Sequence, residues 1–361
     1  MLNSRKKISL RQAMVLFLVA TSSPSMTNVP NATAATAHQA AWLSPIVSFI
    51  IIIPIIFIYK SIFTTYKEES FAEVIEDILG SFLGKIIAVM YIAFLTILLS
   101  IVLRHFAENI VSTIFPNENI LVFMIAIIFT VAVILRRGLV VLARMGEIIL
   151  IFLIVIFLAI STFGAKDIEI SRLTPISYLD FLPILGASTA IVPVFSLFSY
   201  TFLLSNHIND KEKIAKVCTR AFLLLTFLMS IVLIMTIGIL GDSTVALTSN
   251  PYILTVKQIS IFEAIERIEA SVVNMWIVSD FVIISMITFA VHNMIKSVFK
   301  LSDTKNFISI YLVIIFFIGS LIANNSFELQ TFEQFLLPVE IFWAYILPGF
   351  VFIIGKIRKK I

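Results

Sequence analysis

Long apolar stretches separated by short polar segments run through the whole chain. A helix needs about 20 mostly apolar residues to cross the ~30 Å hydrocarbon core of a bilayer. The first and the sixth of the stretches are the least apolar, because each contains a proline and several Ser or Thr residues. The pattern predicts an all-α integral membrane protein, one polytopic domain over residues 1–361, with ten transmembrane helices at 13–30, 41–59, 82–103, 119–135, 146–164, 181–204, 221–241, 270–291, 307–323 and 335–355.

Composition supports a membrane protein and excludes several function classes. Of the 361 residues, 60% are hydrophobic and 13% are charged, against about 25% charged in soluble domains. A soluble fold of this length cannot hide so much apolar surface, which excludes a soluble enzyme, a nucleic-acid binder and a disordered regulator. One cysteine and four histidines are too few and too scattered for a zinc-type site. We expect no metal or other cofactor.

The positions of Lys and Arg predict the orientation. With the N-terminus inside, 21 of the 26 basic residues fall on the cytoplasmic side of a ten-span topology. Such an excess marks cytoplasmic loops, so both termini are expected in the cytoplasm. A signal peptide is the alternative for the N-terminus, since basic residues precede an apolar run there. That run is short, however, and nine further spans follow it.

The ten spans divide into two halves with matching interruptions. The first repeat covers about 10–164, the second about 180–330, and helix 10 about 335–355. Polar, proline-containing breaks in helices 1 and 6 are typical of a 5+5 inverted-repeat transporter fold of the LeuT type, with its site at mid-membrane. Backbone groups freed by proline survive in lipid only where they line a cavity or meet a ligand. The expected ligand-binding residues are Ser22, Ser23, Ser25, Pro193, Phe195, Ser196 and Ser199.

A simpler interpretation is that Pro24 and Pro193 only kink packed helices, with Ser and Thr hydroxyls satisfying the backbone.

Charged residues inside the spans are few, and such residues are functional candidates. Asp280 is the deepest, and it could either carry a proton or hydrogen-bond a neighbouring helix. Glu147 is expected to pair with Arg144 at the cytoplasmic face.

The loop between the seventh and eighth spans contains an amphipathic segment. Ile261, Phe262, Ile265 and Ile268 share one helical face, and Glu263, Glu266 and Arg267 share the other. An interfacial helix that covers the outer mouth and a helix that rests on lipid headgroups are both compatible with this pattern. We expect Glu266 and Arg267 to have a structural or partner-contacting role.

Motifs for catalysis are absent from the sequence. There is no phosphate-binding glycine loop, no His-Glu-x-x-His and no Gly-x-Ser-x-Gly. We therefore expect no enzymatic activity, and an enzyme embedded in the membrane is a weaker alternative.

Several segments resemble the spore germination permease family, the B subunits of spore germinant receptors. The segment from Arg136 to Arg144, followed by Glu147, is similar to that family's "R-K-G-x-x-x-x-A-R-x-x-E" between spans 4 and 5. Similar segments at the start of the first span, before the sixth and before the eighth are Ile8-Ser9-Leu10-Arg11-Gln12, Leu173-Thr174-Pro175 and Glu266-Arg267-Ile268-Glu269. The resemblance marks Arg137, Gly138, Arg144, Glu147, Glu266 and Arg267 as structural motif residues.

The resemblance implies a ten-helix fold within the amino acid–polyamine–organocation superfamily. It also implies a permease-like subunit that senses a small germinant, such as an amino acid, at the inner membrane of a bacterial endospore. The implied partners are a receptor A subunit and a lipoprotein C subunit, besides the bilayer. A secondary amino-acid transporter, coupled to protons through Asp280, is the competing hypothesis.

Two departures from the family pattern concern the ligand-facing segments. Relatives carry a glycine-containing break in span 1, where this chain has Ser22-Ser23-Pro24-Ser25. Relatives often have "F-x-G-x-E" in span 6, where residues 195–199 contain neither glycine nor an acid. The missing acid removes a partner for a ligand ammonium group, so the resemblance predicts the scaffold better than it predicts the ligand.

Overall fold

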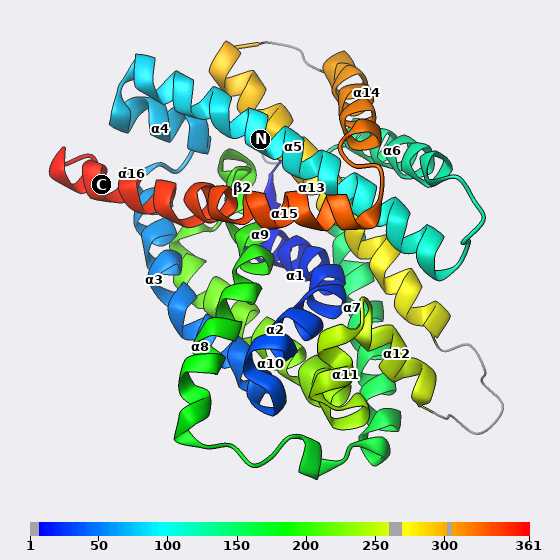
Figure 1. Cartoon of the computed structure of the whole chain (residues 1–361). Helices are drawn as coiled ribbons and strands as arrows, with labels where there is room; N and C mark the ends of the chain where they lie inside the picture. Colours follow the sequence, from blue (N-terminus) through cyan, green and yellow to red (C-terminus); the bar gives the residue numbers. More distant parts are fainter. Residues whose placement is uncertain (1–6, 260–268, 302–304) are drawn as a thin grey trace.

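The computed structural model describes residues 7–259, 269–301 and 305–361, and it is predominantly helical (Figure 1). The predicted amphipathic segment with Glu266 and Arg267 lies outside these residues. The elements are β1 (Ile8–Ser9), α1 (Leu10–Thr27), α2 (Val29–Ala37), α3 (Ser44–Thr65), α4 (Phe71–Leu79), α5 (Ser81–Thr113), α6 (Ile120–Arg137), α7 (Leu139–Gly164), α8 (Phe181–Ser188), α9 (Val192–Phe202), β2 (Ile208–Asn209), α10 (Ile214–Leu240), α11 (Asp242–Leu247), α12 (Pro251–Gln258), α13 (Glu269–Phe299), α14 (Lys305–Leu321), α15 (Ser326–Ile341) and α16 (Leu347–Ile357).

Eight helical stretches of the described chain are long and apolar enough to cross a membrane, and Phe307–Leu321 is a shorter apolar helix. The eight are Val29–Thr65, Ser81–Thr113, Ile120–Arg137, Leu139–Asp167, Tyr178–Phe202, Lys211–Leu240, Glu269–Phe299 and Ser326–Ile357. Their outer surfaces carry many exposed Ile, Leu, Val and Phe side chains. Such surfaces suit lipid, so the chain is a multi-pass membrane protein.

Helix α1 lies at the centre of the bundle, in contact with α7, α9, α10 and α13 (Figure 1). Nearly all of its side chains are buried. Its start is fixed by a capping box, in which the Ser9 hydroxyl accepts from the Gln12 backbone and the Gln12 side chain accepts from the Ser9 backbone. Strand β1 leads into this cap and pairs in parallel with β2, which follows α9. The beginning of α1 is therefore tied to the segment that follows α9.

Lys211, which follows β2, connects this segment to the end of α3. Its side chain is 5% exposed, and its Nζ donates to the Lys67 carbonyl at 2.6 Å. The ammonium also lies 5.4 Å from the ring centroid of Phe63. Lys67 itself pairs with Glu212 at 3.0 Å, but both of these side chains are more than half exposed. The buried lysine is therefore expected to contribute far more to stability than the exposed pair.

We expect Lys211→Met to lower the free energy of unfolding by about 2 kcal/mol, because the partly buried carbonyl groups of Tyr66 and Lys67 lose a charged donor. Lys67→Ala, which removes only a surface ion pair, should cost less than about 1 kcal/mol. Thermal unfolding of the purified chain in detergent measures both. Equal losses in the two variants would contradict the assignment.

The family-like segment from Arg136 to Arg144 forms the link between α6 and α7, and the link explains why it contains a glycine. Gly138 has a φ of 94°, a left-handed conformation that glycine adopts without strain. Glu147 accepts a hydrogen bond from the Gln12 side chain at 3.2 Å, and in the described part of the chain it forms no ion pair with Arg144. The expected Arg144–Glu147 pair is therefore replaced by a contact between α7 and α1. Arg144 is exposed, so water can solvate its charge.

Candidate functional site

The hydrogen-bond ladder of α1 opens at Pro24. Proline has no N–H to donate to the Ala20 carbonyl, and the Ser23 N–H donates to the Ser279 hydroxyl of α13 at 2.9 Å. The Ser279 hydroxyl in turn donates to the Val19 carbonyl at 2.7 Å. One serine of α13 therefore satisfies the backbone groups that the opening leaves unpaired. The helix then ends at Thr27, and α2 starts at Val29.

A second interruption separates α8 from α9. Residues Thr189–Ile191 form a 3₁₀ turn between the two helices, and Pro193 stands in the first turn of α9, where a missing N–H costs nothing. The Ser48 hydroxyl lies 3.1 Å from the Ser188 carbonyl. The Tyr345 hydroxyl donates to the Val192 carbonyl at 2.7 Å. As in α1, side chains of neighbouring helices satisfy the interrupted backbone.

A cavity of about 340 Å³ lies beside both interruptions, near the lower end of the ~300–1,000 Å³ range of small-molecule sites. Its walls come from α1 and α2, α5, α9, α13 and α15. Most of the lining is apolar. The lining residues are Ser23, Pro24, Thr27, Asn28, Ala32, Leu98, Ile101, Val102, His105, Asn109, Ala190, Pro193, Val194, Leu197, Tyr200, Asp280, Ile283, Ile287, Glu333, Gln334, Leu336, Leu337 and Glu340.

Three residues that the sequence singled out line this cavity: Ser23, Pro193 and Asp280. Ser22 and Ser25 line a separate cavity of about 40 Å³ between α1, α7 and α10. Their hydroxyls donate to carbonyls of the preceding turn of α1, those of Leu18 and Thr21. Both serines are thus satisfied within their own helix, on another face from Ser23.

The predicted residues of α9 have three different neighbours. The Phe195 ring packs against Phe222 of α10, with ring centroids 4.9 Å apart. The Ser196 hydroxyl lies within hydrogen-bonding distance of Glu340 on α15. The Ser199 hydroxyl donates to the Ala344 carbonyl at 2.6 Å. None of the three is among the residues that line the larger cavity.

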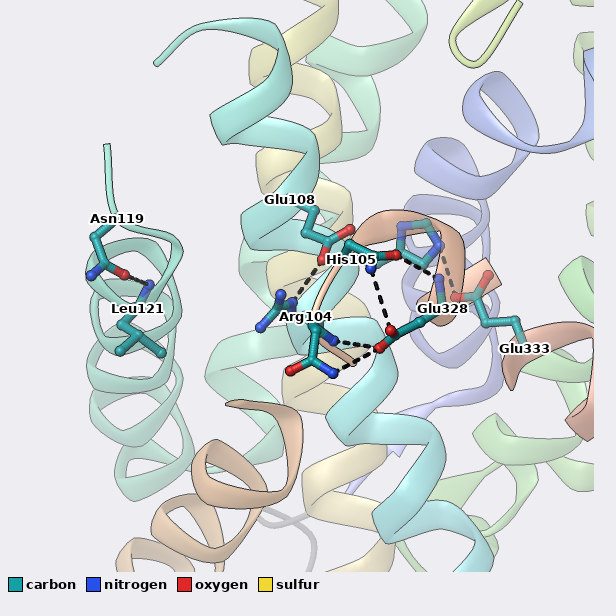
Figure 2. A network of polar contacts seen from close by, with 9 residues as sticks. Arg104, His105, Glu108, Asn119, Leu121, Glu328 and Glu333 are labelled. Atoms are coloured by element: carbon teal, nitrogen blue, oxygen red, sulfur yellow. Dashed lines mark hydrogen bonds and ion pairs between the residues drawn. The ribbon is translucent and has the colours of Figure 1, made fainter. Parts of the chain in front are cut away.

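Three carboxyl groups and one imidazole, from three helices, face the cavity: Asp280, Glu333, Glu340 and His105. Figure 2 shows His105 of α5 and Glu333 of α15 pointing toward one another, with His105 Nε2 and Glu333 Oε1 2.8 Å apart. Glu340 also accepts from the Tyr200 hydroxyl at 3.2 Å. Asp280 is 7% exposed and lies beside Ser23.

Sequence reasoning did not assign His105, Ser279 or Glu333 to the site, and it treated Glu340 only as one of the few charged residues inside the predicted spans. For the two glutamates, the sequence contains a spacing that could have indicated their role. Glu333 and Glu340 lie seven residues apart, so they share one face of α15 with Leu336 and Leu337 between them. All four line the cavity. For His105 and Ser279 only the packing of α5 and α13 against α1 reveals the role.

The arrangement is suited to binding a small molecule. It combines apolar walls with a few convergent polar groups, as ligand sites commonly do. Among the residues that the structure describes, no group of three or more His, Cys, Asp or Glu side chains is placed to hold a metal ion.

Comparison with known proteins gives a family and a fold. A family model described as "Spore germination protein" matches residues 7–328. Spore germination protein KB of Bacillus subtilis (strain 168) is 20% identical over 99% of this chain and 96% of its own length. Spore germination protein YndE of the same organism is 21% identical over 100% of this chain and 99% of its own.

A crystal structure of MhsT in complex with L-phenylalanine has a similar fold. Its TM-score is 0.66 over 97% of this chain and 90% of MhsT, at 13% identity. Identity this low shows the fold alone. The family match and the full-length relatives confirm the resemblance seen in the sequence motifs, and the chain belongs to the spore germination protein family.

Proposed function

We propose that this protein is the permease-like membrane subunit of a spore germinant receptor and that it senses a small nutrient in the cavity between its two interrupted helices. Membership in the spore germination protein family supports the role in germination. The observation that carries the proposal is the cavity of about 340 Å³ where α1 and α9 meet α5, α13 and α15. A nutrient held there contacts all five helices, so its binding can change how they pack.

The proposal includes ten membrane crossings in a 5+5 arrangement, with both termini in the cytoplasm. The eight long apolar stretches support most of these crossings, and the proposal assigns the other two to Phe307–Leu321 and the buried helix α1. The excess of Lys and Arg on one side supports the orientation. The inner membrane of the endospore is the proposed location, and an A subunit and a lipoprotein C subunit are the proposed partners.

A secondary transporter is the second candidate, and the fold shared with MhsT favours it. Both functions need a cavity at mid-membrane. They differ in whether solute crosses the membrane, so they can be separated by experiment.

Deletion of the gene tests the proposal. Mutant spores should lose the response to at least one nutrient of a broad panel, measured as loss of refractility, while uptake of labelled solutes stays unchanged. Restoring the gene should restore the response. Loss of uptake with every germination response intact would instead establish a transporter. Neighbouring genes for an A subunit and a lipoprotein would further support the receptor.

A further inference from the structure

Acidic side chains outnumber basic ones in the lining of the cavity. Asp280, Glu333 and Glu340 line it, together with His105, and no Lys or Arg is among the lining residues. The histidine is paired with Glu333 at 2.8 Å. Within the described part of the chain, neither Asp280 nor Glu340 forms an ion pair with a basic side chain. Two carboxyl groups therefore face the cavity without a basic partner.

Both carboxyl groups are held in place by hydroxyl groups. Ser196 and Tyr200 of α9 hold Glu340 of α15 at the cavity wall. Asp280 follows Ser279, the residue that bridges the opened turn of α1, and it lies beside Ser23. Neutral hydroxyl partners satisfy some lone pairs, but they bring no opposite charge. An ionised carboxylate away from bulk water is costly unless a cation accompanies it.

The same wall offers a negatively charged group the amide donors of Asn28, Asn109 and Gln334, but no Lys or Arg. Two helices begin at the cavity, α2 and α9, and a helix start is where backbone N–H groups could meet an anion. Each has a proline in its first turn, Pro30 in α2 and Pro193 in α9, which removes one of those donors. A ligand carboxylate would also lie among three acidic side chains.

We propose that the ligand of this cavity is a small organic cation: a protonated primary amine on a short apolar group, without a free carboxylate. The ammonium group would bind one of the two carboxyl groups that lack a basic partner, Asp280 or Glu340, by charge-assisted hydrogen bonds. The apolar group would contact the hydrophobic lining, which comprises Leu98, Ile101, Val102, Val194, Leu197, Ile283, Ile287, Leu336 and Leu337. This inference rests on the proposed function, since it names the nutrient class that the receptor subunit would sense.

Ligand-dependent thermal unfolding of the purified full chain in detergent tests the inference. The probes are propyl- to hexylammonium chloride, the carboxylates of equal chain length, the corresponding α-amino acids, and NaCl and KCl. We expect the amines to raise the unfolding temperature by about 3 °C or more at saturation, with no comparable effect of the other probes. Stabilisation by the amino acids or the carboxylates at least equal to that by the amines would overturn the inference. The same holds if NaCl or KCl alone reproduces the effect.

Isosteric variants identify the carboxyl groups involved. Of the variants Asp280→Asn and Glu340→Gln, the one that removes the carboxylate bound to the ammonium should weaken the apparent amine affinity at least about tenfold, the loss of one charge-assisted contact. Glu118→Gln, which changes an exposed acid between α5 and α6, should leave the affinity unchanged. Unchanged affinity in both cavity variants would contradict the assignment. If either variant fails to fold, the ranking of the probes on the unsubstituted chain still decides whether the ligand is a cation.

Germination assays separate failure of this inference from failure of the proposed function. If deleting the gene abolishes a response to a zwitterionic amino acid and amines neither bind nor trigger germination, the receptor role stands and the cation assignment falls. If deletion changes no germination response while amines bind the purified chain, the cation site stands and the receptor role falls.

Discussion

Spores that carry Ser23→Leu should need roughly 100-fold more of the native nutrient to germinate, or should not respond at all. Ser23 lines the cavity from α1, and a leucine there places three more carbon atoms in the space available to a ligand. The fold should persist, because the contact that Ser23 makes with Ser279 uses the Ser23 backbone N–H and not its side chain. Leucine also removes the hydroxyl that hydrogen-bonds Asp280, which adds to the loss of nutrient binding. Germination as a function of nutrient concentration measures the effect, and immunoblots of spore membranes measure abundance.

Two further variants make this result specific. Ile314→Leu changes a side chain that is 43% exposed on α14, and it should alter neither response nor abundance. Ser199→Leu should behave differently from Ser23→Leu. The Ser199 hydroxyl donates to the Ala344 carbonyl in a buried contact between α9 and the π-turn Phe342–Ile346, which follows α15. Leucine at this position should therefore lower abundance. A wild-type response in Ser23→Leu would place the ligand outside this cavity.

Eight of the ten predicted spans overlap long apolar helices of the described chain, but hydropathy misjudged where some of these helices end. The third predicted span stops at residue 103, before the charged Arg104 and Glu108, whereas α5 continues to Thr113. Arg104 and Glu108 lie one helical turn apart and pair at 2.7 Å, and each side chain is only 8% exposed (Figure 2). Pairing within one helix lowers the cost of burying both charges. A hydropathy average counts each charge separately and cannot register this.

The sequence marked the regions of Pro24 and Pro193 as candidate interruptions, but it did not predict the orientation of the side chains there. Successive helical residues point about 100° apart, so Ser22, Ser23 and Ser25 cannot all face one cavity. Of these, Ser23 faces the larger cavity, and Ser22 and Ser25 face the smaller one toward α7 and α10. Which face points to which neighbour depends on how α1 packs, and a single sequence does not contain that information.

The acid absent from residues 195–199 has a counterpart elsewhere in the chain. The sequence indicated that an ammonium group would lack a partner near the sixth span. In the structure, Glu340 of α15 lies against Ser196 and Tyr200 of α9. A carboxyl group therefore reaches the same region from a different helix. The contact joins residues that are 144 positions apart, so no local motif could have predicted it.

Gly84→Ala should cause the largest loss of folded protein among single-methyl changes in this chain. A Cβ at this position would lie 2.5 Å from the Cα of Glu76 in α4, closer than two carbon atoms can approach. Backbone atoms cannot rotate away, so α4 and α5 would have to separate. Alanine is favoured over glycine in a helix by about 1 kcal/mol, but forced overpacking commonly costs about 1–3 kcal/mol and more where backbone must move. We expect a net loss of at least about 2 kcal/mol.

Gly349→Ala is the matched control, because a Cβ there would meet no atom within 4 Å. It makes the same chemical change inside a helix, α16, and retains only the favourable propensity term. The yield of purified protein and its thermal unfolding in detergent should therefore fall for Gly84→Ala and stay level or rise slightly for Gly349→Ala. Because α4 packs against the start of α5, and α5 carries His105 at the cavity, the Gly84 variant should also weaken the nutrient response of whatever protein remains. Equal yields and unfolding temperatures for the two variants would show that α4 and α5 do not pack this closely.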